Sequence, residues 1–91
     1  MLFRSPPQAG FTFTPNPPQE NTPTRFLNGA SADVIQWNWN FGDGTTSTEV
    51  NPLHQFTSDG TFDVCQIVTN ASGCRDTLCI PVRAQIGRAH V

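Results

Sequence analysis

The sequence predicts an all-β protein, built as an antiparallel β-sandwich of about seven short strands. No segment repeats its apolar residues at the helical period, and turn residues interrupt the chain at short intervals. Residues 35–41 alternate strictly between apolar and amide side chains. A strand of that kind has one dry face and one wet face, so a second layer must cover the dry one. We therefore expect two packed antiparallel sheets.

The first two strands are short. Phe11 and Phe13 alternate with threonines as far as the proline-rich stretch 15–18, which can end an edge strand but cannot continue a central one. Residues 24–28 form the second strand, and Gly29 closes it.

The third strand runs from Val34 to Phe41 and carries the strongest pattern. Its apolar face comprises Ile35, Trp37, Trp39 and Phe41, and its polar face comprises Gln36, Asn38 and Asn40. The strand stops at the turn formed by residues 42–44, Gly-Asp-Gly. Glycines accept a positive φ, and Asp43 can bond the backbone two residues further on.

Four segments follow this turn. Residues 45–51 are polar and form either a short strand or a loop, and residues 54–57 form a brief strand. The last two strands, 61–69 and 75–84, are joined by residues 70–73, whose composition is typical of a hairpin loop.

Gln66 conflicts with the pattern of its strand, because it shares the parity of three apolar residues, Phe62, Val64 and Val68. One alternative is a bulge that turns Ile67 inward instead. The other is a buried amide with hydrogen-bond partners, since an unpaired buried amide costs about 1–3 kcal/mol.

Composition narrows the classes of partner. The chain has 91 residues, 36% of them hydrophobic and 13% charged, and its formal net charge is −2. No basic run is present, which argues against nucleic acid as a partner. The apolar stretches are a few residues long, too short for a membrane span. A domain this small buries a modest share of its surface and benefits from a covalent cross-link.

The three cysteines leave two alternatives open. If the hairpin loop centres on Ser72, Cys65 and Cys79 face one another on adjacent strands, where a disulfide is geometrically possible. Such a bond would contribute about 3 kcal/mol and would leave Cys74 to pair with a neighbouring domain or to stay free. The alternative is three unpaired thiols in a reducing compartment.

The sequence contains no arrangement typical of an enzyme. It lacks a Gly-x-Ser-x-Gly elbow, a His-Glu-x-x-His helix, a phosphate loop and a glycine-rich dinucleotide turn. Its two histidines are His54 and His90, and the cysteines do not have zinc-site spacing. We expect no catalytic residues.

Three ordered motifs stand out: Trp-Asn-Phe-Gly-Asp-Gly at residues 39–44, Asn-Pro-Leu-His-Gln-Phe at residues 51–56 and Gly-Thr-Phe-Asp-Val at residues 60–64. They resemble the motifs of PKD domains (polycystic kidney disease domains). Residues 39–44, Trp-Asn-Phe-Gly-Asp-Gly, are similar to the family signature W-D-F-G-D-G, with Asn40 in place of the usual Asp. Residues 51–56 are similar to N-P-x-H-x-Y and residues 60–64 to G-x-Y-x-V, with Phe in both Tyr positions. The resemblance covers residues 9–84 and implies an Ig-like antiparallel β-sandwich.

The resemblance also implies a set of core and turn residues: Trp39, Phe41, Gly42, Asp43, Gly44, His54, Phe56, Gly60, Phe62 and Val64. Trp39 is expected between the sheets, and His54 is expected to make a structural hydrogen bond at a sheet corner. Trp37 is either core or a candidate ligand contact at the rim of the core. Asp43 is expected to shape its turn. Asp43 is also a calcium candidate, because some related domains of secreted hydrolases are associated with calcium, although Asn40 removes one charge there.

The function implied by the resemblance is that of a noncatalytic extracellular module in a larger secreted or surface protein of a bacterium. We expect it to act as a spacer and as a protein or polysaccharide interaction domain, with neighbouring domains of the same polypeptide as partners. The alternative is a dedicated carbohydrate- or collagen-binding module of a secreted hydrolase or adhesin. No cofactor is expected apart from the calcium candidate.

Both ends of the chain match a common short-read sequencing adapter. Residues 2–5 and 86–91 can be encoded by complementary stretches of it. We therefore expect residues 1–8 to be adapter-derived or linker residues and residues 85–91 to be an adapter-derived tail. The domain itself would be 9–84, a fragment of a longer metagenomic gene.

Overall fold

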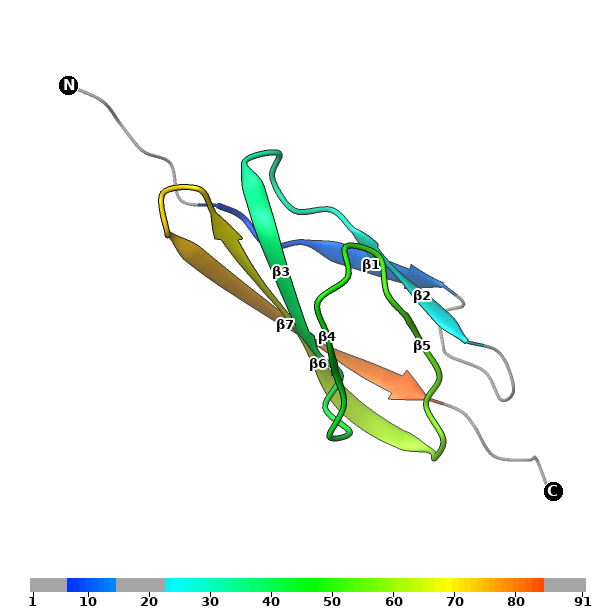
Figure 1. The fold of residues 1–91 in the computed structure, drawn as a ribbon. Helices are drawn as coiled ribbons and strands as arrows, with labels where there is room; N and C mark the ends of the chain where they lie inside the picture. The colour runs from blue at the N-terminus through cyan, green and yellow to red at the C-terminus, as the bar shows by residue number, and fades with distance from the viewer. Residues whose placement is uncertain (1–6, 15–22, 85–91) are drawn as a thin grey trace, which may run out of the picture.

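A computed structural model describes residues 7–14 and 23–84, which form two antiparallel sheets packed against each other (Figure 1). The predicted antiparallel β-sandwich of seven short strands is confirmed. No helix in these ranges is long and apolar enough to cross a membrane. The adapter hypothesis falls mostly outside the described residues. Of the segment 1–8, Pro7 is buried, and Gln8 exchanges two hydrogen bonds of 3.0 Å with Ser31.

The smaller sheet has the strand order β1-β2-β5, with β1 at Phe11–Thr14, β2 at Thr24–Asn28 and β5 at Leu53–His54. The prediction of a strand at 54–57 was wrong in its extent. The chain leaves the sheet after His54, and this places the ring of Phe56 in the core, 1% exposed.

The larger sheet has the order β4-β3-β6-β7. Its strands are β3 (Val34–Asn40), β4 (Thr46–Ser47), β6 (Gly60–Asn70) and β7 (Arg75–Ala84). The hairpin of β6 and β7 keeps one register along its whole length. The polar segment after the Gly-Asp-Gly turn contains only the two-residue strand β4.

The start of β3 departs from strict alternation. Its register against β6 shifts between Val34 and Gln36, as in a β-bulge. A bulge changes the face on which the next residue points. Val34 is therefore buried, whereas Ile35 is 63% exposed, and the expectation that Ile35 shares the apolar face was wrong.

The centre of the interior is Phe26, on the middle strand of the smaller sheet, and it is fully buried. Five aromatic rings surround it at centroid distances of 5.3 to 6.4 Å, those of Phe11, Phe13, Trp39, Phe41 and Phe56. Burying one such ring contributes about 1.5–3 kcal/mol, so the sheets are held together largely by aromatic packing.

Gln66 is fully buried and lies among hydrogen-bond partners, so the second of its two alternatives is correct. The backbone N–H of Gly10 donates to its Oε1 at 2.7 Å, and its Nε2 donates to Oδ1 of Asn28 at 3.2 Å. The indole Nε1 of Trp37 donates to the same oxygen of Asn28 at 2.9 Å. We call Gly10, Asn28, Trp37 and Gln66 the amide network. It links the larger sheet to the segment before β1 and to the end of β2.

Candidate functional site

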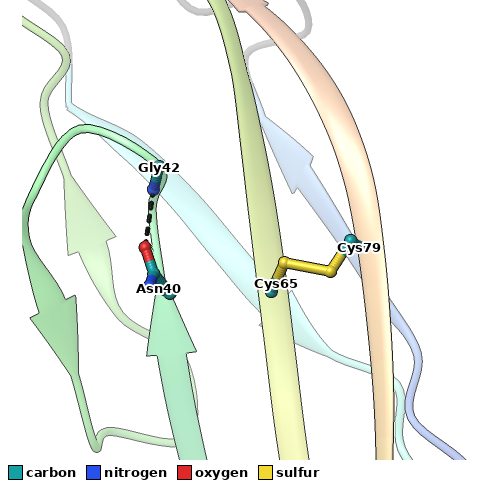
Figure 2. The surroundings of a disulfide bond; sticks show 4 residues. All are labelled: Asn40, Gly42, Cys65 and Cys79. Carbon is teal, nitrogen blue, oxygen red and sulfur yellow. Dashed lines mark hydrogen bonds between the residues drawn. A yellow bond between two sulfur atoms is a disulfide. The ribbon is translucent and has the colours of Figure 1, made fainter.

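The Gly-Asp-Gly turn after β3 has the conformation that its sequence predicts. Gly42 has a φ of 79°, and an added Cβ would lie 2.7 Å from the carbonyl oxygen of Asp63 on β6. Only glycine fits there, because the turn lies directly against a neighbouring strand. Asn40 accepts a hydrogen bond of 2.9 Å from the backbone N–H of Gly42 (Figure 2). An amide thus fills the position where the family has a carboxylate, and it does so as an Asx-turn acceptor.

Asp43 connects this turn to the other sheet. Its Oδ1 accepts hydrogen bonds from the N–H of Thr45 at 3.1 Å and from the hydroxyl of Thr45 at 2.5 Å. Its Oδ2 lies 2.8 Å from Nε2 of His54 on β5. Because an ionised carboxylate can only accept, Nε2 of His54 must carry the proton that it donates. The turn of one sheet is thereby tied to a strand of the other.

His54 is held by ring packing as well as by this hydrogen bond. Its imidazole stacks on Phe41 at 4.1 Å with an interplanar angle of 2°, and it meets Phe56 edge-on at 4.7 Å. Phe56 in turn stacks on Phe62 at 4.8 Å. We call Phe26, Phe41, His54, Phe56 and Phe62 the aromatic cluster.

The acidity of Asp43 reflects its contacts. Partial burial raises the pKa of Asp43, but the hydrogen bonds from Thr45 and His54 outweigh it, and the pKa lies below its ordinary value. Both carboxylate oxygens already have protein partners. Among residues 7–14 and 23–84, no three His, Cys, Asp or Glu side chains gather where they could hold a metal ion. The calcium candidate at Asp43 stays a prediction.

The two tryptophans differ in environment. Trp39 is 1% exposed, and its indole N–H donates to the carbonyl of Glu49 at 2.7 Å. Trp37 is half-buried and packs against the core, and its indole N–H donates a hydrogen bond to Asn28. Trp37 is thus partly exposed, and its role as a ligand contact stays a prediction.

Cys65 and Cys79 form a disulfide between β6 and β7, as Figure 2 shows. They are paired directly in the register, with their Cα atoms 4.0 Å apart, which is the arrangement that the hairpin spacing predicts. Cys74 is free and half-buried. The alternative of three unpaired thiols does not hold.

The remaining signature positions belong to β6 and the turns. Val64 is fully buried, Phe62 is half-buried, and Gly60 opens the strand with a φ of 146°. Gly44 has a φ of 94°, and an added Cβ would meet no atom within 4 Å. Glycine is therefore favoured at this position by the backbone conformation and not by lack of space.

Sequence reasoning missed one group of residues. The outward faces of β3, β6 and β7 bring together Gln36, Asn38, Thr69 and Arg75 over a shallow hollow. The signal was present, because the hairpin arithmetic that aligns the cysteines also aligns Thr69 with Arg75, and Gln36 and Asn38 lie on the polar face of the third strand.

These features define the class of protein, a disulfide-bonded Ig-like β-sandwich module with an aromatic interior. A family model for the PKD domain matches residues 4–85. The chain therefore belongs to the PKD domain family, and the resemblance of its three motifs is confirmed.

Known proteins of three kinds are similar to the chain. Collagenase ColA of Bacillus cereus is 52% identical over 40 residues, which is 44% of this chain and 4% of the collagenase. The crystal structure of the PKD1 domain from the Vibrio cholerae metalloprotease PrtV is 29% identical with a TM-score of 0.77, covering 88% of this chain and 98% of that one. A structure from work on carbohydrate-binding modules of the β-sandwich superfamily has a TM-score of 0.83 at 24% identity. It covers 90% of this chain and 35% of that one, and it shows a shared fold.

Proposed function

We propose that the chain is a noncatalytic extracellular module of a larger secreted or surface protein of a bacterium, working as a spacer and as a protein or polysaccharide interaction domain. The observation that carries this proposal is the match to ColA, in which the aligned stretch is 4% of the collagenase. A PKD domain that spans so little of its relative is one module among others.

The fold supports the same proposal. The described residues contain a core that spans both sheets and a hairpin closed by a disulfide. Disulfides form and persist in oxidising compartments, which favours a location outside the cytoplasm. A disulfide and an aromatic interior together help a domain this small to stay folded.

The experiment uses the oxidised 91-residue chain. We expect cooperative thermal unfolding and no hydrolysis of gelatin, casein or chitin. Turnover that His54→Ala abolishes would contradict the noncatalytic assignment, since His54 is the one histidine within the described residues and is hydrogen-bonded to the carboxylate of Asp43. His54→Gln serves as a matched control, because an amide can still donate to Asp43.

A second candidate function is a dedicated carbohydrate- or collagen-binding module, favoured by the partial exposure of Trp37. Retention of the chain on chitin, cellulose or collagen that Trp37→Ala removes would support it. No retention, or retention that Trp37→Ala leaves unchanged, would contradict it. Trp37→Phe is the matched control, because it keeps an aromatic ring while it removes the hydrogen bond to Asn28.

A further inference from the structure

The outer face of the larger sheet carries a hollow of about 380 Å³ beside the turn between β6 and β7. Its lining residues come from three strands and the turn: Gln36, Asn38, Ile67, Thr69, Gly73 and Arg75. The register places them in two adjacent rows, Asn38 beside Ile67, and Gln36 beside Thr69 and Arg75. The aromatic cluster and the amide network both lie on the opposite, inner side of this sheet.

The turn between β6 and β7 places no side chain over one side of the hollow. Gly73 has a φ of 86°, and a Cβ built on it would meet no atom within 4 Å. The rim is therefore backbone alone at this point, and a ligand can enter over it.

The chemistry of the lining is specific. Gln36 and Asn38 offer two primary amides that both donate and accept, Thr69 adds a hydroxyl, and the side chain of Ile67 adds apolar surface. Arg75 is the charged residue of the lining, and no carboxylate is part of it. In the part of the chain that the structure describes, the guanidinium of Arg75 forms no ion pair or hydrogen bond.

We propose that this hollow binds a carboxylate-bearing sugar, a hexuronic acid unit of an acidic polysaccharide. This inference rests on the proposed function, because it names a ligand class and a site for the interaction module. A guanidinium binds a carboxylate through two parallel hydrogen bonds. Amides and a hydroxyl match the paired donors and acceptors of ring hydroxyl groups, and Ile67 can pack against ring C–H groups. The volume lies within the range of about 300–1,000 Å³ typical of small-ligand sites.

An acidic peptide would supply a carboxylate too, but the geometry favours the sugar. Extended peptides bind sheets mainly by main-chain pairing at an exposed edge. The hollow is lined by side chains on the outer face of β3, β6 and β7, and its central strand, β6, is paired on both sides within the sheet. It therefore offers side-chain groups rather than a free strand edge.

The test is a titration of the oxidised, ¹⁵N-labelled 91-residue chain with trigalacturonic acid, followed by NMR. We expect saturable shifts of the side-chain amide signals of Gln36 and Asn38, and no saturable shift with cellotriose, a neutral trisaccharide. Arg75→Gln should weaken binding by at least about tenfold, which corresponds to about 1.4 kcal/mol. The affinity of Arg75→Lys should lie between that of the unchanged chain and that of Arg75→Gln, since lysine keeps the positive charge but lacks the planar guanidinium.

Arg83→Gln is the matched control. Arg83 is exposed on the same strand and the same face as Arg75, but it lies outside the hollow. Its replacement removes the same charge and should change the affinity less than about twofold. An exposed charge farther from the ligand than the Debye length of about 8 Å is largely screened at 0.15 M salt.

Three results would overturn the proposal: no saturable shift with trigalacturonic acid, equal weakening by the two arginine variants, or equally tight, Arg75-dependent binding of the tripeptide Gly-Asp-Gly. In each case a well-dispersed spectrum of the chain would leave the spacer function standing. An unfolded spectrum, or hydrolysis of a substrate, would instead count against the proposed function itself.

Discussion

The aromatic cluster and the amide network join the same two sheets by different physical means. In the aromatic cluster, rings from both sheets pack around Phe26, and His54 supplies the polar link to the turn. In the amide network, Gln66 is buried in the larger sheet and reaches the smaller one through hydrogen bonds to Gly10 and Asn28. Apolar packing is tolerant of small changes in geometry, whereas a buried amide is stable only when its partners stay in place.

This difference indicates that one region mainly stabilises the fold, whereas the other mainly fixes the position of one segment in it. Aromatic burial supplies most of the free energy, since it removes large apolar surfaces from water. The amide network adds less, but it fixes the position of the segment before β1, because moving that segment away leaves Oε1 of the buried Gln66 without its donor, the N–H of Gly10. Substitutions in the aromatic cluster should therefore mainly lower the free energy of unfolding, whereas substitutions in the amide network should also loosen the segment before β1.

Phe26→Ala should cause the largest loss. Truncating a buried phenylalanine costs about 3–5 kcal/mol, a large share of the stability of a domain this size. Urea unfolding of the oxidised chain measures the loss. Phe13→Ala is the matched control on the neighbouring strand, and we expect it to cost less, since Phe13 is only half-buried. Equal losses for the two variants would contradict the central position of Phe26.

Gln66→Leu should cost about 1–3 kcal/mol, because it leaves the backbone N–H of Gly10 without its acceptor. The same variant should increase the hydrogen-exchange rate of the Gly10 amide more than that of amides near Phe26, which NMR can resolve. Gln36→Leu, on the outer face, should change the stability by no more than about 0.5 kcal/mol. A gain in stability for Gln66→Leu would show that the network is not needed to place the first strand.

Acid should weaken the sandwich at two carboxyl groups, one beside the aromatic cluster and one outside both regions, with a smaller effect on stability. Asp43 borders the aromatic cluster. Asp33 accepts hydrogen bonds from Ser31 and Asn70 at the other end of the sandwich, and these lower the pKa of Asp33. Since both carboxyl groups have a lowered pKa, their contribution is fully present above the ordinary value of 3.8 and is lost as the pH falls through the folded-state value.

Asp43→Asn and Asp33→Asn should each flatten the pH dependence of the unfolding free energy below pH 4, by an amount set by the hydrogen bonds that each carboxylate accepts. Unfolding midpoints measured between pH 2 and pH 7 provide the test. An unchanged slope in Asp43→Asn would mean that its bonds to Thr45 and His54 do not stabilise the fold.

Local patterns predicted much of this fold. The boundaries of β2 and β7, the burial of Trp39 and the facing positions of Cys65 and Cys79 follow from alternation, turn chemistry and hairpin spacing, which act over a few residues.

Features that depend on distant parts of the chain could not be predicted in the same way. The bulge at Ile35 depends on the register against β6, and the partners of Gln66 lie in segments far from it in sequence. Phe26 looks like any apolar strand residue until the two sheets are stacked around it. The hollow at Arg75 required three strands to be placed side by side.

The central claim is that the aromatic cluster and the amide network belong to one cooperative domain, and the two tryptophans report on them separately. Trp37 belongs to the amide network, and Trp39 packs against Phe26 of the aromatic cluster. The measurement is urea unfolding of Trp37→Phe and Trp39→Phe, each followed by fluorescence of the remaining tryptophan and by far-ultraviolet circular dichroism. We predict that the fluorescence and circular dichroism transitions coincide within each variant, as two-state unfolding requires. A Trp37 fluorescence transition at lower urea than the circular dichroism transition of the same variant would contradict the claim.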